Sequence, residues 1–223
     1  MIKGNVKGVV FDLDSTLIRS SIDFPRMKKR MIAILEANGV PRGLLSPTET
    51  TVVTLEKAER TWDEREISEQ DRKPILAQID VVMNQTELEA VPRVKEVEGA
   101  SEAVRELREK GYRLAILTRS HHEYTVEALR KTSMLEYFEL ILARGETPKP
   151  KPYREALDYT AKLMKLKLDE IIFVGDNPID SACAKNAEVR FIAVTTGRTS
   201  REQWIENGCK IILESVTELI EIL

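Results

Sequence analysis

The sequence predicts an α/β fold: a Rossmann-like, doubly wound parallel sheet with an inserted all-helical segment. From about residue 92 onward, short apolar runs alternate with amphipathic helical segments, which is typical of a parallel sheet covered by helices. The run at residues 6–11 is apolar without polar alternation, as in a strand buried on both faces. We therefore predict a core of residues 1–19 and 92–223, interrupted by a helical cap at residues 20–91.

The composition and charge of the chain restrict its expected partners and location. Charged residues make up 32% of the 223 residues and the net charge is −3, with no dense block of Lys and Arg, so nucleic acid is not expected as the main partner. No apolar run is long enough to cross a membrane, and Met1–Asn5 is too short and polar for a signal peptide. Cys183 and Cys209 lack metal-ligand spacing and suggest a reducing compartment, so we expect a cytoplasmic protein. Its oligomeric state is left open.

The predicted cap contains three helices. Residues 24–38 have apolar positions on one helical face. Ser46-Pro47-Thr48-Glu49 has the pattern of a helix start with Ser46 as N-cap, and this second helix is expected to reach about residue 60. A third, longer helix is expected over residues 68–91, in which Pro74 marks either the first turn or a kink.

The rest of the core is expected to alternate between strands and helices. The further strands are predicted at residues 112–117, 138–142, 171–174, 190–194 and 210–213. The helices are predicted at residues 101–110, 120–132, 152–166, 179–186, 199–207 and 215–223, and the second of these begins with a capping box, Ser120-His121-His122-Glu123.

Two carboxylates follow the first strand. Asp12 and Asp14 are two residues apart, so in extended backbone they project to the same side. Like charges held this close repel each other unless a cation lies between them or one carboxyl keeps its proton. Mg²⁺ takes oxygen ligands of this kind together with phosphate oxygens. The alternative is a local turn in which both side chains cap backbone groups.

Other polar residues stand at or near the ends of later strands. Thr118 follows the second core strand, Asp176 and Asp180 follow residues 171–174, and Lys149 lies between them in a Pro-rich loop. Because ligands of open parallel sheets bind beyond the carboxyl ends of the strands, these residues are expected to meet at one edge. Individually, each has an ordinary interpretation as a capping hydroxyl, a solvated charge or a helix N-terminal acid. Together they suit a phosphate and a divalent cation.

These residues lie in four segments that resemble the motifs of the haloacid-dehalogenase-like hydrolases, most closely the phosphoglycolate-phosphatase-like branch. The segments are Asp12-Leu13-Asp14-Ser15-Thr16, Leu117-Thr118, Lys149-Pro150-Lys151-Pro152 and Gly175-Asp176-Asn177-Pro178-Ile179-Asp180. The resemblance covers the whole chain and includes the helical cap. It implies a Mg²⁺-dependent phosphatase that hydrolyses a small phosphate monoester through an aspartyl-phosphate intermediate.

The resemblance also implies residue roles. Asp12 would be the nucleophile and Asp14 the general acid and base. Lys149 would steady Asp12 and bind the phosphate. The metal would be held by Asp12, the Asp14 backbone carbonyl and Asp176, with Asp180 acting directly or through water.

Phosphate contacts are implied for Thr118, with Arg119 beside it as a further candidate. Arg119 either reaches an acidic group of the substrate or points to solvent. His121 and His122 are expected to be solvated, with a substrate contact as the alternative. Many relatives carry Gly at the position of Ser15, so this loop is expected not to need a positive φ.

Other functions would use some of the same residues. A phosphomutase of the same fold would use the same residues and return the phosphoryl group to a sugar. A phospho-aspartate signalling domain also combines acids, a Thr and a Lys, but is about half as long and lacks the helical insertion. Dehalogenation has no use for an acid at Asp14.

Overall fold

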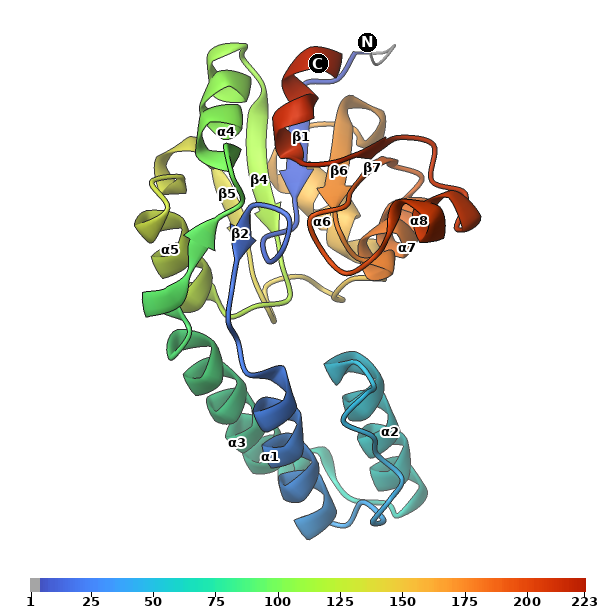
Figure 1. Cartoon of the computed structure of the whole chain (residues 1–223). Helices are drawn as coiled ribbons and strands as arrows, with labels where there is room; N and C mark the ends of the chain where they lie inside the picture. The colour runs from blue at the N-terminus through green and yellow to red at the C-terminus, as the bar shows by residue number, and fades with distance from the viewer. Residues whose placement is uncertain (1–4) are drawn as a thin grey trace. The chain divides into compact units, whose positions relative to one another are not determined.

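The computed structural model describes residues 5–223; residues 1–4, where no signal peptide is expected, lie outside the described part. The chain divides into two compact units, Met1–Ser20 together with Val91–Leu223, and Ser21–Ala90 (Figure 1). The predicted boundaries at 19/20 and 91/92 differ from these by one residue.

The larger unit is built on a parallel sheet, which in the described residues has six strands. Their spatial order is β5 (Leu140–Leu142), β4 (Arg113–Leu117), β1 (Gly8–Phe11), β6 (Ile171–Gly175), β7 (Arg190–Val194) and β8 (Ile212–Leu213). The predicted α/β class is confirmed. The chain order reverses around β1, so the carboxyl end of β1 lies at the topological switch point, where open sheets bind ligands.

Helices flank the sheet (Figure 1). They are α4 (Ala100–Glu109), α5 (His122–Lys131), α6 (Glu155–Leu163), α7 (Pro178–Ala187), α8 (Arg201–Glu206) and α9 (Leu219–Ile222). Strand side chains alternate between the faces. Val10 and Phe173 pack on one face in a buried cluster with Leu157 of α6 and Ala184 of α7. This tight apolar packing fixes the positions of the strand ends.

The register of the central strands aligns their carboxyl ends. Phe11 of β1 is paired with Ile116 of β4 on one side and with Val174 of β6 on the other. The next backbone amide, that of Asp12, donates to the Val174 carbonyl oxygen at 2.9 Å. Asp12 and the residues that follow β4 and β6 therefore leave the sheet at the same level.

The smaller unit contains α1 (Phe24–Ala37), α2 (Thr51–Glu64) and α3 (Glu69–Leu88). Met31 of α1, Trp62 of α2 and Met83 of α3 are buried. The predicted helix start at Ser46 is wrong. Residues 46–49 form a turn, in which the Glu49 amide donates to the Ser46 carbonyl.

Two contacts explain where α2 begins. The carboxylate of Glu49 pairs with Lys57 and accepts from the Ser46 amide at 3.5 Å, so it closes the turn at residues 46–49 and not a helix. Thr50 has extended backbone angles, and its hydroxyl accepts from the Val53 amide, which makes Thr50 the N-cap. Pro74 lies inside α3, beyond its first turn. The other two predicted helix starts of this unit are in place: α1 begins at Phe24, and Ser68 is the N-cap of α3.

A short antiparallel pair was not predicted. It joins β2 (Ile18–Arg19) to β3 (Lys95–Glu96), two strands of two residues each, both in the larger unit. Between β1 and β2 the backbone turns tightly, because the Leu17 amide donates to Leu13 and the Ser15 amide donates to Ile18. Strands this short carry too little periodicity to be read from sequence.

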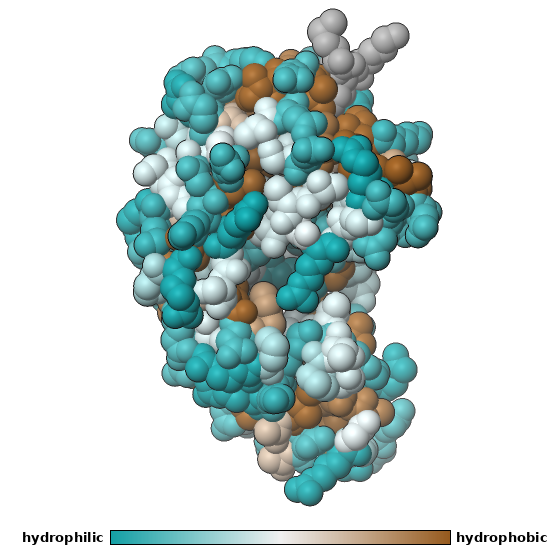
Figure 2. All heavy atoms as spheres, in the orientation of Figure 1, coloured by the Kyte–Doolittle hydropathy of each residue, from teal (hydrophilic) through white to brown (hydrophobic). Residues whose placement is uncertain are grey.

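Hydrophilic side chains cover much of the face shown in Figure 2, and hydrophobic ones lie among them in several separate places. The exposed large hydrophobic residues are Phe24, Leu44, Val53, Val81, Tyr153, Leu163 and Ile205. Within residues 5–223, each helix is too short or too polar to cross a bilayer.

Candidate active site

Three carboxylates and one ammonium meet at the carboxyl end of the sheet. Asp12, Asp176 and Asp180 are buried, and each offers an oxygen within 4.8 Å of the others. The Nζ of Lys151 donates to Oδ1 of Asp12 at 2.6 Å and to Oδ1 of Asp180 at 2.7 Å. The side chain of Lys151 is only 2% exposed. The structure brings three of the four predicted acids together at this edge.

The predicted lysine is wrong by two positions. Lys149 has a side chain that is 55% exposed, and it pairs with Glu155 at the start of α6 at 2.8 Å. Lys151 occupies the place assigned to Lys149. Both lysines precede a proline in Lys149-Pro150-Lys151-Pro152, so the sequence pattern alone leaves two equivalent candidates.

Burial dominates the electrostatics of this cluster. Loss of hydration, together with the negative charge of Asp12, raises the pKa of Asp176 and Asp180 well above the ordinary value for aspartate. Burial alone would lower the pKa of Lys151, but the charges of Asp12 and Asp180 outweigh it and raise that pKa. If all three carboxyls were ionised, the site would carry more negative charge than a single ammonium can neutralise.

This donor set fits a divalent cation. Carboxylate oxygens are the ligands that hard cations prefer, and a cation among them would relieve the repulsion that raises the two pKa values. Asp12, Asp176 and Asp180 are the residues that would hold it. The side chain of Asp14 is not part of this cluster, so Asp14 would contribute to the metal only through its backbone carbonyl.

Two glycines let the acids approach the backbone closely. A Cβ atom on Gly175 would lie 2.5 Å from Oδ2 of Asp180, and one on Gly197 would lie 1.9 Å from Oδ2 of Asp176. The hydroxyl of Thr16 donates to Oδ1 of Asp176 at 3.2 Å. Asp176 is therefore held between the loop after β1 and the loop after β7, and sequence analysis missed Thr16 and Gly197.

The expectation for Ser15 is also wrong. Ser15 has a φ of 65°, in the left-handed region that favours glycine. Tertiary contacts impose this conformation, because the Ser15 amide donates to Ile18 and its carbonyl accepts from the hydroxyl of Thr196. The positive φ that glycine would adopt easily in this loop is kept here with a serine.

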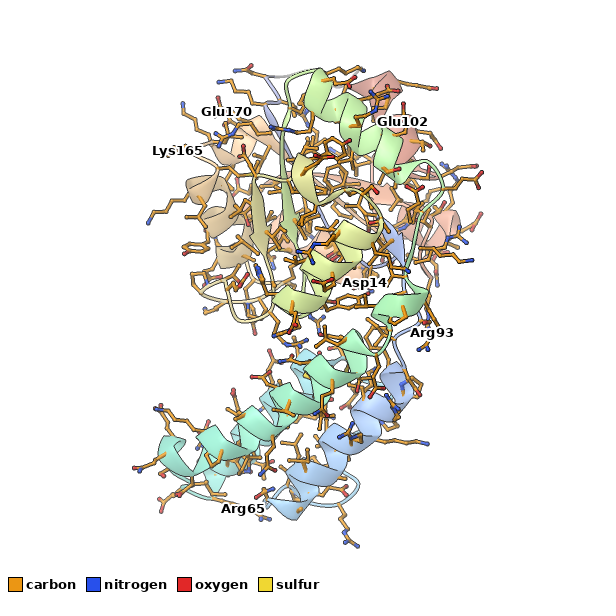
Figure 3. All side chains as sticks on the ribbon, turned by 90° about the vertical axis from the view of Figure 1, so that its left-hand side faces the viewer. Asp14, Arg65, Arg93, Glu102, Lys165 and Glu170 are labelled. Carbon is orange, nitrogen blue, oxygen red and sulfur yellow. The ribbon has the colours of Figure 1, made fainter. Side chains whose placement is uncertain are left out.

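Asp14 has an environment of its own. Ser120 donates its hydroxyl to Oδ2 and Tyr124 donates its hydroxyl to Oδ1, both at 2.8 Å. Figure 3 shows Asp14 beside α5, the helix that carries Tyr124. Loss of hydration raises the pKa of Asp14 to about 6, although the neighbouring hydroxyls oppose the rise.

The predicted capping box at Ser120 is not formed. The N-cap of α5 is His121, which makes no side-chain capping bond, and the Ser120 hydroxyl is used by Asp14 instead. A capping bond typically contributes about 1 kcal/mol to a helix. The helix forgoes this contribution, and Ser120 and Tyr124 are two site residues that sequence analysis missed.

Thr118 and Arg119 lie where the sequence places them, directly after β4. Thr118 is buried, and its Oγ1 accepts from the Ser120 amide at 3.1 Å. Burial lowers the pKa of Arg119, while Asp180 and Asp12 act in the opposite direction. Arg119 is partly buried, so its side chain does not lie fully in solvent. His122 is half-exposed and lies 2.9 Å from Glu146.

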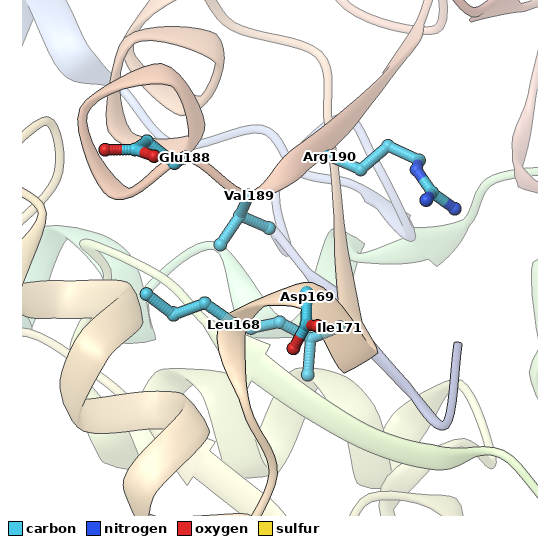
Figure 4. Close-up of a pocket in the computed structure, with 6 residues that line it drawn as sticks. All are labelled: Leu168, Asp169, Ile171, Glu188, Val189 and Arg190. Atoms are coloured by element: carbon cyan, nitrogen blue, oxygen red, sulfur yellow. The ribbon is translucent and has the colours of Figure 1, made fainter. Parts of the chain in front are cut away.

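A separate pocket lies at the other end of the strands (Figure 4). Its volume is about 390 Å³, and it is lined by Leu168, Asp169, Ile171, Glu188, Val189 and Arg190. Ile171 and Arg190 are the first residues of β6 and β7, so the pocket borders the amino edge of the sheet. The acids lie beyond the carboxyl edge, and the pocket is therefore no part of their site.

Comparison with known proteins decides the family. The family model described as haloacid dehalogenase-like hydrolase matches residues 9–194, which is most of the chain. The chain belongs to the haloacid dehalogenase-like hydrolases. The resemblance inferred from the four sequence segments is confirmed, and so is the expectation of an enzyme of the hydrolase class.

Two relatives are similar to this chain at moderate sequence identity. Pyrophosphatase PpaX of Halalkalibacterium halodurans is 30% identical over 130 residues, which cover 58% of this chain and 60% of that protein. The match thus spans less than two thirds of this relative. Phosphoglycolate phosphatase of Nitrosospira multiformis is 24% identical over 219 residues, which cover 98% and 96% of the two chains.

A solved structure supports the fold of this haloacid dehalogenase-like hydrolase. The crystal structure of a predicted phosphoglycolate phosphatase from Haemophilus somnus superposes with a TM-score of 0.68 at 20% identity, over 99% of both chains. At this identity the likeness establishes the fold alone.

Proposed function

We propose that this haloacid dehalogenase-like hydrolase is a Mg²⁺-dependent phosphatase that hydrolyses small phosphate monoesters through an aspartyl-phosphate on Asp12. The observation that carries the proposal is the buried cluster of Asp12, Asp176 and Asp180 with Lys151 bound to two of them. The names of its relatives, a phosphoglycolate phosphatase over nearly the full length and a pyrophosphatase over part of it, favour hydrolysis over phosphoryl transfer to a sugar.

The proposed reaction begins with attack of the Asp12 carboxylate on phosphorus. The bond from phosphorus to the ester oxygen breaks, and Asp14 gives its proton to the departing oxygen. A bound Mg²⁺ would neutralise negative charge on the phosphoryl group. Lys151 and Thr118 offset the same charge from the protein side, which matters most in a buried site.

In the second half of the reaction, water attacks the acyl phosphate on Asp12. Asp14 takes the proton from that water, phosphate leaves, and the Asp12 carboxylate is restored. A pKa of about 6 suits Asp14 for both steps, because the carboxyl can donate or accept a proton near neutral pH. We propose that the unit Ser21–Ala90 acts as a cap that excludes water and selects the leaving group.

The test is phosphate release from a panel of small phosphate monoesters with and without Mg²⁺. Asp12→Asn is expected to abolish turnover while the circular dichroism spectrum stays that of the wild type. Activity that persists in Asp12→Asn, or in wild-type protein with excess chelator, would contradict the nucleophile or the metal assignment respectively. Quantitative formation of a second sugar phosphate in place of free phosphate would indicate a mutase.

A further inference from the structure

We propose that Tyr124 and Ser120 are positioning residues that hold the carboxyl of Asp14 in place for proton transfer to and from the substrate. This inference rests on the proposed function, because it assigns Asp14 the role of acid and base. It concerns two residues outside the four sequence segments by which the family is recognised.

The geometry fixes both carboxyl oxygens. Tyr124 donates to Oδ1 and Ser120 donates to Oδ2, each at 2.8 Å, so the plane of the carboxyl is set by two hydroxyls. A carboxylate offers about four lone-pair positions, and the two hydroxyls take one on each oxygen. The remaining positions can carry the single proton that the leaving oxygen receives.

The two donors belong to one rigid segment. Tyr124 is fully buried in α5, and Ser120 is buried in the turn before it. The Ser120 amide also donates to Oγ1 of Thr118, the candidate phosphate-binding hydroxyl. One stretch of seven residues therefore places both the group that contacts the phosphoryl oxygens and the groups that orient Asp14.

A purely structural role for Tyr124 and Ser120 explains fewer of the observed contacts. A buried tyrosine hydroxyl needs some partner, and a serine before a helix ordinarily caps it. Here Ser120 stands in a capping-box sequence, yet its hydroxyl goes to Asp14 and the side chain of the N-cap residue His121 makes no capping bond. Asp12 and Asp180 are held by the ammonium of Lys151, and Asp176 accepts from a single hydroxyl, that of Thr16. Asp14 has a hydroxyl donor on each of its two oxygens.

The test compares two leaving groups. An alkoxide is strongly basic and needs a proton as it departs, whereas p-nitrophenolate leaves without one. The quantity is kcat/KM, which reports the steps up to cleavage of the ester bond. Tyr124→Phe keeps the buried ring and removes only the hydroxyl. It is expected to lower kcat/KM about tenfold for the best alkyl phosphate of the substrate panel, and to leave p-nitrophenyl phosphate within about twofold.

Ser120→Ala is expected to show the same pattern, and the double variant a larger loss on the alkyl ester. The matched control is Tyr112→Phe, because Tyr112 also donates its hydroxyl, at 3.0 Å, but to the carbonyl of Leu223. That control is expected to leave both esters unchanged. An equal fall on the two esters, or no fall on the alkyl ester, would overturn the proposal.

A second measurement does not depend on turnover. In crystal structures of the wild type and Tyr124→Phe, the Asp14 carboxyl is expected to leave its position in the variant while Lys151 keeps its contact with Asp12. An Asp14 carboxyl that stays in place overturns the proposal. Failure of the wild type to cleave either ester would instead count against the proposed function, and the structural comparison would still decide the role of Tyr124.

Discussion

At the scale of single residues, two lysines separated by one proline occupy opposite environments. Lys151 is enclosed by two aspartates, whereas Lys149 lies at the surface beside Glu155. The chemistry of an ammonium at a phosphoryl group requires the first environment, since a surface ion pair is screened by water and contributes little. The two lysines therefore form a natural pair of test and control.

Lys151→Ala is expected to lower kcat by at least about 100-fold, because it removes the positive charge that faces Asp12 and the phosphoryl group. Lys149→Ala is expected to stay within about twofold of the wild type, since its partner is a surface glutamate. Phosphate release at saturating substrate measures both. A large loss in Lys149→Ala with a normal Lys151→Ala would restore the lysine that sequence analysis favoured.

Ser15 offers a test of backbone strain. A residue with a side chain in the left-handed region costs about 1–2 kcal/mol relative to glycine, while glycine loses more chain entropy on folding. Ser15→Gly is therefore expected to be as stable as the wild type or up to about 1 kcal/mol more stable. Ser15→Val is expected to be the least stable, because β-branched residues tolerate positive φ worst. Urea unfolding gives the order, and a valine variant as stable as the serine would contradict it.

At the scale of elements, the loop after β7 packs against the acid cluster without supplying a metal ligand. Gly197 lies against Asp176, and Thr196 donates to the Ser15 carbonyl in the loop after β1. These contacts connect the loop that follows the candidate ligand Asp12 with a loop that packs against another, Asp176. Groups that orient metal ligands are often as important for affinity as the ligands themselves.

Gly197→Ala is expected to weaken Mg²⁺ binding about tenfold or more, because the added methyl group would displace the carboxylate of Asp176. Titration calorimetry, or electron paramagnetic resonance with Mn²⁺, measures this without turnover. Gly208→Ala is the control: Gly208 has a φ of 74° and no atom within 4 Å of an added Cβ, so the change strains the backbone away from the acids. Equal metal affinity in both variants would contradict the role of Gly197.

The element scale also shows what the sequence could predict. Apolar runs located the ends of β1 and β6, so Asp12 and Asp176 could be assigned to one edge before any coordinates. The loop before α6 has no such periodicity, and two Lys-Pro pairs left the choice of Lys149 or Lys151 open. The φ of Ser15 depends on a contact with the loop after β7, which no local pattern encodes.

Ser120 and Tyr124 were missed for a different reason. Ser120 lies in the turn before α5 and Tyr124 in its first turn, so no helical spacing relates the two hydroxyls. Their approach to Asp14 depends on the position of α5 beside the loop after β1. The capping-box pattern at Ser120 obscured this, because it offered a sufficient local explanation for the serine.

At the scale of the whole molecule, the excess of buried acid makes stability depend on pH and on the cation. Raised pKa values mean that the folded protein binds more protons than the unfolded chain. Its stability therefore falls as pH rises from the ordinary aspartate pKa of 3.8, through about 6 for Asp14 and about 8 for Asp176. A bound cation replaces the missing protons and removes much of this loss.

Metal-free protein is thus expected to lose on the order of 5 kcal/mol of stability between pH 5 and pH 8, and protein saturated with Mg²⁺ to lose much less. Thermal or urea unfolding across this range, with chelator or with Mg²⁺, measures the difference. Asp176→Asn without metal is expected to show a weaker pH dependence. Identical profiles with and without Mg²⁺ would contradict a cation at these acids.

The separation of the site residues along the chain has a consequence for synthesis in the cell. The bond between Lys151 and Asp12 joins positions 139 residues apart, and Thr16 reaches Asp176 across 160. On the ribosome, β1 emerges long before either of its neighbours β4 and β6, and its edges have no partner while Ser21–Ala90 is being made. A helical unit that forms from local contacts in that interval would give the nascent chain a folded part while β1 still lacks its partner strands.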